Sequence, residues 1–303
     1  MDTSKFVSAR DPEVWSSMKY RPIVSGDYKI VQENPDFIVE GSVIPTDRIL
    51  YTALTKPESM WITENCSENV FDENTREGYL LLKDDVTELT GNYNSGLTIF
   101  NNTINTAYYN VLSIVIPTQI TRIGSDSFTN YYGLTSVTIP DSVTSIGSYA
   151  FQYCKSLSTI EIPNTVKSIE SNAFSHCTSL TGELIIPNSV ESLGGAAFGG
   201  CVNLTSLTIS ESINTIPMNA FHDCTGLVKV IIPNSVSEII AAAFKNCNNL
   251  LEVICNAIEP PTLQVSNNFV AENDTLYVPA ESVAAYKATN WNDVFNENIQ
   301  AIR

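Results

Sequence analysis

Apolar residues recur with a fixed period along this chain from Val111 onward, and a phenylalanine marks each period. The steps between successive phenylalanines are 23, 23, 24, 23 and 23 residues, and the six are Phe128, Phe151, Phe174, Phe198, Phe221 and Phe244. A cysteine follows three residues after each of the last five, and a leucine follows six residues after all six. A unit of this length cannot bury its apolar side chains alone, so the pattern predicts stacked coils with one shared core.

Each unit predicts two short strands joined by turns. Residues 136–139 alternate polar and apolar side chains, which is the period of a strand with one buried face. Pro140 ends this strand because proline has no N–H group to donate to a ladder, and Asp141 begins a turn. Val143 and Ile146 then predict a second short segment whose side chains point inward.

The cysteines that share this phase are predicted to be buried free thiols. They are Cys154, Cys177, Cys201, Cys224 and Cys247. Neighbouring coils stack about 4.8 Å apart, which is close enough for disulfides, but residues in register have nearly parallel Cβ vectors. A buried thiol behaves as a small apolar side chain. Cys66 and Cys255 lie outside the phase.

The repeated order I-P-x-x-V-x-x-I-x-x-x-A-F-x-x-C-x-x-L in residues 111–256 resembles the BspA-like leucine-rich repeat family. The resemblance implies a mainly β, right-handed leucine-rich-repeat solenoid with coils of about 23 residues. It also implies a cap at each end, because an open end exposes strand edges and core. Members of this family are common on bacterial cell surfaces, so the resemblance implies a cell-surface or extracellular location.

The pattern divides the chain into four segments. They are an N-terminal non-repeat segment that acts as an anchor or a cap (1–47), an N-terminal cap with degenerate first repeats (48–110), the leucine-rich repeat solenoid (111–256) and a C-terminal cap (257–303). Residues 84–89 resemble the strand–turn step of the repeat, whereas 90–110 depart from it. Residues 11–18 predict a brief helix, and 282–287 predict a short amphipathic one.

Charge excludes several classes of partner. The chain has 16 Lys+Arg against 33 Asp+Glu, a formal net charge of -17. Nucleic acids and anionic membranes attract clustered Lys and Arg, so we expect neither as a partner. No apolar run reaches the ~18 residues of a membrane span, so we expect no membrane insertion. The first residues lack the apolar stretch of a secretory signal peptide, so the export that the resemblance implies has no visible signal.

No motif in the sequence predicts catalysis, a cofactor or a metal site, and we expect a protein that is not an enzyme. His176 and His222 are the only histidines, and they occupy different positions in their repeats. We therefore expect that they do not meet in a site. Asp84 and Asp85 are interpreted as solvated turn residues.

The outward positions of the predicted strands form the candidate partner-binding face. Its residues are Thr138, Glu161, Ile185, Thr208, Lys229, Ile231, Glu252 and Ile254. The three isoleucines predict an apolar interaction patch. The alternative is that they are single exposed apolar residues of the kind that most surfaces carry.

Two functions follow as hypotheses. The first is a non-enzymatic, adhesin-like binding protein that presents a repeat-built face to a protein or glycan partner, which by resemblance is host matrix or a cell surface. The second is a structural virion component, such as a bacteriophage fibre or decoration protein. In that case residues 1–47 would anchor the chain to the particle and hold it in a homo-oligomer.

Overall fold

The computed structural model describes residues 48–53, 60–91, 111–264, 269 and 275–302. The predicted N-terminal segment 1–47, with its helix at 11–18, lies outside the described residues. The same holds for nearly all of the stretch 90–110 that departs from the repeat.

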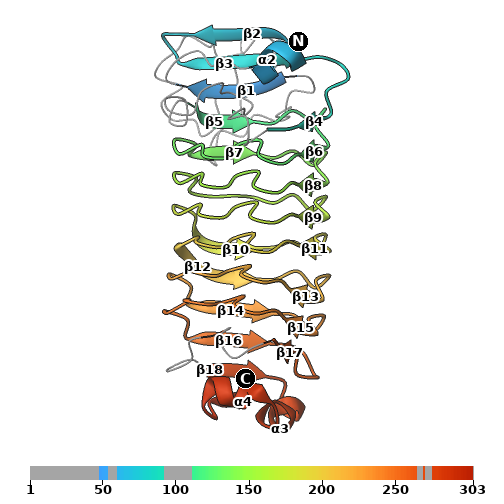
Figure 1. Ribbon diagram of the computed structural model, residues 1–303, viewed down its shortest axis with the longest axis vertical. Coiled ribbons are helices and arrows are strands. Elements are labelled where there is room, and N and C mark those ends of the chain that lie inside the picture. The colour runs from blue at the N-terminus through green and yellow to red at the C-terminus, as the bar shows by residue number, and fades with distance from the viewer. Residues whose placement is uncertain (1–47, 54–59, 92–110, 265–268, 270–274, 303) are drawn as a thin grey trace, which may run out of the picture.

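The chain forms a column of stacked coils, a mainly β solenoid of about 8 turns of roughly 23 residues (Figure 1). The predicted fold class is therefore confirmed. In a typical coil the longer strand lies on one side of the column and a two-residue strand lies on another. Strands of neighbouring coils pair in parallel on both sides, so each coil contacts chiefly the coils before and after it.

The longer strands make what we call the long-strand face. They are β5 (Val111–Val115), β7 (Ser136–Thr138), β10 (Thr181–Ile185), β12 (Asn203–Thr208), β14 (Lys229–Ile232), β16 (Glu252–Cys255) and β18 (Thr275–Val278). The coil between β7 and β10 has no strand at residues 157–163. The face is therefore built from two sheets, one ending at β7 and one beginning at β10.

The shorter strands make the short-strand face. They are β4 (Glu88–Leu89), β6 (Arg122–Ile123), β8 (Ser145–Ile146), β9 (Ser168–Ile169), β11 (Ser192–Leu193), β13 (Thr215–Ile216), β15 (Glu238–Ile239) and β17 (Thr262–Leu263). The second residue of each is apolar and buried, and the first points outward. This is the inward-facing segment that the sequence predicts after each proline turn.

The six phenylalanines stack in the core along the axis of the column. Ring centroids of successive pairs are 5.1, 5.2, 5.1, 6.0 and 5.4 Å apart from Phe128 to Phe244. Phe269 continues the stack, 4.9 Å from Phe244. All seven side chains are buried, so the period read from the sequence is the period of the core.

Each cysteine thiol of the repeat donates a hydrogen bond to the carbonyl of the phenylalanine one coil earlier. The five Sγ···O distances, from Cys154 to Cys247, are 3.2, 3.1, 3.3, 3.2 and 3.2 Å. All seven cysteines of the chain are free thiols, as the sequence predicts for the five in phase. Burial raises the pKa of Cys154, Cys177, Cys201 and Cys224, because a thiolate has no solvation in the core.

Each of the six coils from Phe128 to Phe244 has two residues in the left-handed backbone region, one two positions before the phenylalanine and one two positions after it. The pairs are Asp126/Asn130, Tyr149/Tyr153, Asn172/His176, Ala196/Gly200, Asn219/Asp223 and Ala242/Asn246. Asn, Asp and Gly adopt this region at a low cost in free energy, whereas for a bulky residue the cost is about 1–2 kcal/mol. Tyr153 and His176 are therefore unfavourable choices at a position where the backbone geometry is fixed by the fold.

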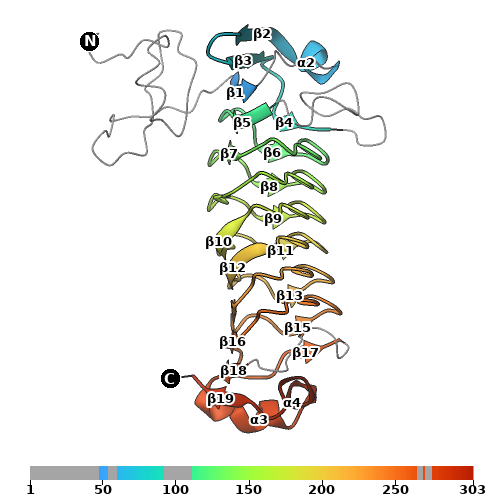
Figure 2. The ribbon, with the colours of Figure 1, turned by 90° about the vertical axis from the view of Figure 1, so that its left-hand side faces the viewer.

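The N-terminal end is closed by antiparallel strands. β1 (Arg48–Ala53) lies between β3 (Glu77–Leu82) and the first parallel strand, β5, and pairs antiparallel with both. β2 (Cys66–Asp72) is the outer strand of this sheet, and the helix α2 (Met60–Asn65) precedes it (Figure 2). An antiparallel pair with acidic side chains on its outer strand limits edge-to-edge association.

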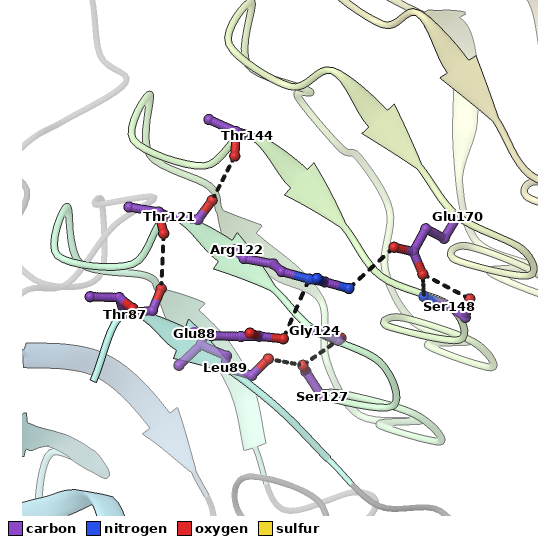
Figure 3. A network of polar contacts seen from close by, with 10 residues as sticks. All are labelled: Thr87, Glu88, Leu89, Thr121, Arg122, Gly124, Ser127, Thr144, Ser148 and Glu170. Atoms are coloured by element: carbon purple, nitrogen blue, oxygen red, sulfur yellow. Dashed lines mark hydrogen bonds and ion pairs between the residues drawn. The ribbon is translucent and has the colours of Figure 1, made fainter. Parts of the chain in front are cut away.

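Residues 84–89 form a coil step, as their resemblance to the repeat suggests. β4 pairs in parallel with β6, and Arg122 of β6 reaches Glu88 in the coil before it and Glu170 two coils after it (Figure 3). Its Nε lies 3.4 Å from Glu88 Oε1 and its Nη2 lies 3.2 Å from Glu170 Oε1. Glu170 in turn accepts hydrogen bonds from the backbone N and the hydroxyl of Ser148 at 3.1 and 3.0 Å. One guanidinium thus connects the capping coil to the regular repeats.

The C-terminal end is closed by two short helices rather than the single one predicted. They are α3 (Val283–Lys287) and α4 (Asn290–Phe295), preceded by the 3-10 turn η3 (Ala280–Ser282) and followed by β19 (Ile299–Ala301) (Figure 2). Thr289 separates the helices, because its hydroxyl accepts from the N–H of Trp291 and caps α4. Trp291 Nε1 donates to the Pro261 carbonyl at 2.8 Å, which holds the cap under the last coil.

Candidate functional site

The outward register predicted for the long-strand face is the register observed. On β14 the side chains of Val230 and Ile232 are buried, whereas Lys229 and Ile231 are not. β16 repeats this alternation. None of the eight residues predicted for the candidate face is buried; they are Thr138, Glu161, Ile185, Thr208, Lys229, Ile231, Glu252 and Ile254.

Strand pairing places the apolar side chains of this face in one row. In register along the column lie Ile185, Thr208, Ile231, Ile254 and Tyr277. Tyr277 was not among the predicted residues, because its coil lacks a phenylalanine at the expected spacing. The alternation in residues 275–278 was the available signal.

Two further apolar side chains lie three residues before Ile231 and Ile254 along the chain. Val228 and Leu251 precede β14 and β16, and 40% and 54% of their surface is exposed. The Leu251 N–H donates to the Val228 carbonyl at 2.9 Å, so the two residues are neighbours in adjacent coils. They were not predicted from the sequence because the strand alternation was taken to begin at the next residue. The equivalent positions of earlier coils, such as Thr135 and Ser158, are polar, so the repeat itself gave no sign of an apolar group here.

We call Val228, Ile231, Leu251, Ile254 and Tyr277 the apolar patch. Between its two halves the Lys229 Nζ and a Glu252 carboxylate oxygen form an ion pair at 3.0 Å. Both charged groups are partly exposed, so the pair contributes at most about 1 kcal/mol to stability. Its larger effect is that the one lysine of the face is neutralised within the face.

Two carboxylates lie in the middle of the same face, between β7 and β12, and we call Glu161 and Glu183 the acidic pair. Both are exposed, and neither forms an ion pair with another residue in the described ranges. A Glu183 oxygen accepts from the Thr208 hydroxyl at 3.1 Å, which keeps this carboxylate beside the row. The face therefore has an acidic middle region and an apolar C-terminal end.

The short-strand face has a different chemistry. The outward residues of its strands from β8 to β17 are Ser145, Ser168, Ser192, Thr215, Glu238 and Thr262. Lys167 and Glu191 form an exposed ion pair beside them at 3.1 Å. A surface of this composition is well hydrated, so the contrast between the two faces singles out the long-strand face.

The prediction that the two histidines do not meet is wrong. The imidazoles of His176 and His222 lie edge to face with ring centroids 6.4 Å apart. They meet across the coil that contributes Gly199 and Gly200. A Cβ atom on Gly199 would overlap Cε1 of His222, and one on Gly200 would overlap Nδ1 of His176, so both rings occupy space that side chains fill in other coils.

Hydrogen bonding and burial set the chemistry of this histidine pair. Nδ1 of His222 lies 2.8 Å from the Asn219 carbonyl and donates to it, while Nε2 lies 3.6 Å from a carboxylate oxygen of Asp223. Tyr153 stacks on His176 with centroids 4.8 Å apart. Desolvation, followed by the nearby His222, lowers the pKa of His176. The two histidines make stacking contacts and a hydrogen bond, but none of these contacts places a nucleophilic side chain beside an imidazole that could act as its base.

The described residues contain neither a cluster of metal ligands nor a helix that could span a membrane. Within those ranges, no group of three or more His, Cys, Asp or Glu residues is arranged to hold a metal ion. No helix in the described part of the chain has the length and apolar content needed to cross a bilayer.

Comparison with known proteins identifies the repeat. The model of the BspA type leucine rich repeat region matches residues 98–183 and 180–267 with 6 copies, which is more than half of the chain. A search of curated proteins found no match.

The T. pallidum leucine rich repeat protein TpLRR is 29% identical, over 46% of this chain and 64% of its own, with a TM-score of 0.44. A leucine rich cell surface protein from Faecalibacterium prausnitzii is 23% identical, over 63% and 60%, with a TM-score of 0.35. The pneumococcal vaccine antigen PcpA is 21% identical, over 74% and 45%, with a TM-score of 0.43. The match thus spans less than two thirds of the length of each. On the strength of its repeats, this chain belongs to the BspA type leucine rich repeat family.

Proposed function

We propose that this protein is a non-enzymatic, adhesin-like binding protein that holds a protein partner on its long-strand face at a cell surface or outside the cell. The observation that carries the proposal is the apolar patch. Ile231, Ile254 and Tyr277 are partly exposed and lie in register on adjacent strands, and the exposed Val228 and Leu251 precede two of these strands. The other strand face of the solenoid is polar. Contiguous exposed apolar surface of this kind marks interaction sites.

The composition of the patch favours a protein over a glycan. Isoleucine, leucine and valine gain free energy by excluding water from apolar surface, which a partner's apolar side chains provide and a sugar's hydroxyl groups do not. Tyr277 adds an aromatic side chain of the type that anchors protein interfaces. The ion pair of Lys229 and Glu252 supplies polar groups within the patch that fix the orientation of a partner.

Family membership supports the proposed location. The virion hypothesis depends on residues 1–47, which lie outside the described residues, and it stays a prediction. Light scattering tests it, by comparing the mass of the full chain with that of a chain that begins at Arg48. A binding protein of the proposed kind gives monomers in both cases, whereas an oligomer that is lost on truncation would favour the virion hypothesis.

Surface plasmon resonance with a double variant tests the proposed function. Ile231→Thr with Ile254→Thr removes apolar surface from the patch but keeps a residue that the chain itself uses in this row, at Thr208. The immobilised probes are fibronectin, laminin and collagen, with an array of glycans for comparison. We expect binding to a protein probe, weakened at least about tenfold in the double variant.

A matched control removes two exposed apolar side chains elsewhere. Met218 and Ile258 are 53% and 52% exposed and lie outside the long-strand face. Met218→Thr with Ile258→Thr should bind as the unaltered protein does. Equal loss in both double variants, unchanged binding in the first, or binding to glycans alone would contradict the proposed function.

A further inference from the structure

The long-strand face is chemically polarised along the axis of the column. Its acidic pair, Glu161 and Glu183, belongs to the coils before and at β10, and its apolar patch belongs to the coils of β14, β16 and β18. Coil by coil, the second outward position holds Glu161, Ile185, Thr208, Ile231, Ile254 and Tyr277. With about 4.8 Å between coils, the five steps from Glu161 to Tyr277 span about 24 Å.

The negative charge of the acidic pair is not compensated within the face. Lys229 is paired with Glu252, which leaves the carboxylates of Glu161 and Glu183 as its free charges. The chain as a whole has a net charge of -17, so the surrounding potential adds to theirs. A positively charged group on a partner would therefore be attracted to the acidic pair and not to the apolar patch.

We infer that the partner segment bound by this face is a protein segment that lies along the column axis, with lysine or arginine over the acidic pair and apolar side chains over the apolar patch. The inference rests on the proposed function and names the chemistry of its partner. Charge complementarity fixes the direction of the segment, and apolar burial supplies most of the affinity.

A second copy of this chain is a poor occupant of the face. Two copies packed face to face in parallel would place acidic pair against acidic pair. Packed antiparallel, they would set the free carboxylates of each copy against the apolar patch of the other, which desolvates charges without pairing them. With 33 acidic against 16 basic residues in each chain, long-range repulsion opposes both arrangements.

Length is the second property that the face specifies. A helix rises 1.5 Å per residue, so about 16 residues span about 24 Å. An extended segment rises about 3.3 Å per residue and spans it with about 7 residues. A library of random peptides of about 16 residues therefore includes both conformations and serves as the probe.

The experiment is selection of peptides displayed on phage against the full chain. Clones that also bind the Ile231→Thr, Ile254→Thr variant are removed, and the surviving peptides are synthesised with a fluorophore. Fluorescence anisotropy then gives Kd for the unaltered chain and for Glu161→Gln with Glu183→Gln, at low and at high salt. The matched control is Glu211→Gln with Glu259→Gln, two exposed carboxylates outside the face.

We expect selected peptides to combine lysine or arginine with leucine, isoleucine or aromatic residues. The acidic-pair variant should weaken their binding about tenfold at low salt and much less at high salt, because salt screens exposed charges. The control variant should bind as the unaltered chain does.

Two outcomes would overturn different claims. Peptides that depend on Ile231 and Ile254 but lack basic residues, and bind the acidic-pair variant equally, would refute the inference and leave the proposed function intact. A library that yields no peptide dependent on these isoleucines would refute the proposed function and the inference with it. Circular dichroism of each variant confirms that the solenoid is folded.

Discussion

The imidazoles of His176 and His222 share a space left by two glycines, and their ring centroids lie 6.4 Å apart in an edge-to-face arrangement. The two residues belong to coils that are not adjacent. Gly199 and Gly200, in the coil between them, have no side chains to separate the rings. The contact thus requires that the intervening coil has no side chains at Gly199 and Gly200.

Replacing Gly200 by alanine should destabilise the protein more than replacing Gly182. Both glycines have positive φ, 75° and 78°, so alanine costs about 1 kcal/mol or more of backbone strain at either position. At Gly182 nothing lies within 4 Å of the added Cβ, whereas at Gly200 it overlaps His176. Urea unfolding measures the difference. His176→Ala should reduce the cost of Gly200→Ala to that of Gly182→Ala, and an unchanged cost would contradict the proposed overlap.

Stability should fall as the pH drops below about 6.5, in part because of His176. Burial lowers the pKa of His176 in the folded protein, whereas the unfolded chain has the ordinary value of about 6.5. The unfolded chain therefore binds the proton first, and this favours unfolding as the pH falls through about 6.5 toward the folded pKa.

His176→Asn should reduce this pH dependence. Asparagine occupies the equivalent left-handed position at Asn130 and Asn246, so the backbone accepts it. The measurement is the free energy of unfolding in urea at neutral pH and near pH 5. A variant with the same loss of stability between the two conditions as the unaltered chain would show that His176 does not contribute.

Phe174→Ala should lower the free energy of unfolding by about 3–5 kcal/mol. The ring is buried and stacks on Phe151 and Phe198 at 5.2 and 5.1 Å, so its removal leaves a cavity that neighbouring coils cannot fill without breaking their strand pairing. Met218→Ala, at an exposed position, should change it by less than about 0.5 kcal/mol. A cost at Phe174 no larger than at Met218 would refute the assignment of this ring to the core.

The thiols should be unreactive toward a thiol reagent while the protein is folded. Burial raises the pKa of Cys66 to about 12 and raises those of Cys154, Cys177, Cys201 and Cys224 as well, so little thiolate forms near neutral pH. In urea all seven cysteines should react. Release of chromophore from Ellman's reagent measures both states. Rapid reaction of several thiols in the native protein would contradict the burial of the repeat cysteines, Cys154 to Cys247.

Much of the fold follows from the sequence because each coil repeats the same local rules. Phenylalanine spacing defines the core from Phe128 to Phe244, and alternation defines which side chains of β14 and β16 point outward. The last stacked ring escaped this reasoning because Phe269 follows Phe244 after 25 residues instead of 23. A fixed spacing finds residues only where the coils have equal length.

The candidate face was predicted in part for a related reason. Ile231 and Ile254 lie at positions that alternation identifies, whereas Val228 and Leu251 lie where the chain enters the strand and no periodic rule applies. The contact between His176 and His222 was missed because the two residues occupy different positions in their repeats. Aligning equivalent positions does not reveal a contact that crosses a coil with glycines at Gly199 and Gly200. Such contacts depend on three-dimensional space and not on phase.

Because one phenylalanine of each coil stacks on the next, the column grows in length by a similar amount with every coil. Each coil adds one step of about 4.8 Å, so the distance between any two groups on the long-strand face is set by the number of coils between them. Deleting the whole coil that contains Thr208 would bring the carboxylate of Glu183 about 4.8 Å nearer to Ile231 and leave the neighbours of each coil chemically similar. Gain or loss of a single repeat would therefore change the distance between the acidic pair and the apolar patch by about 4.8 Å without altering the register of the strands.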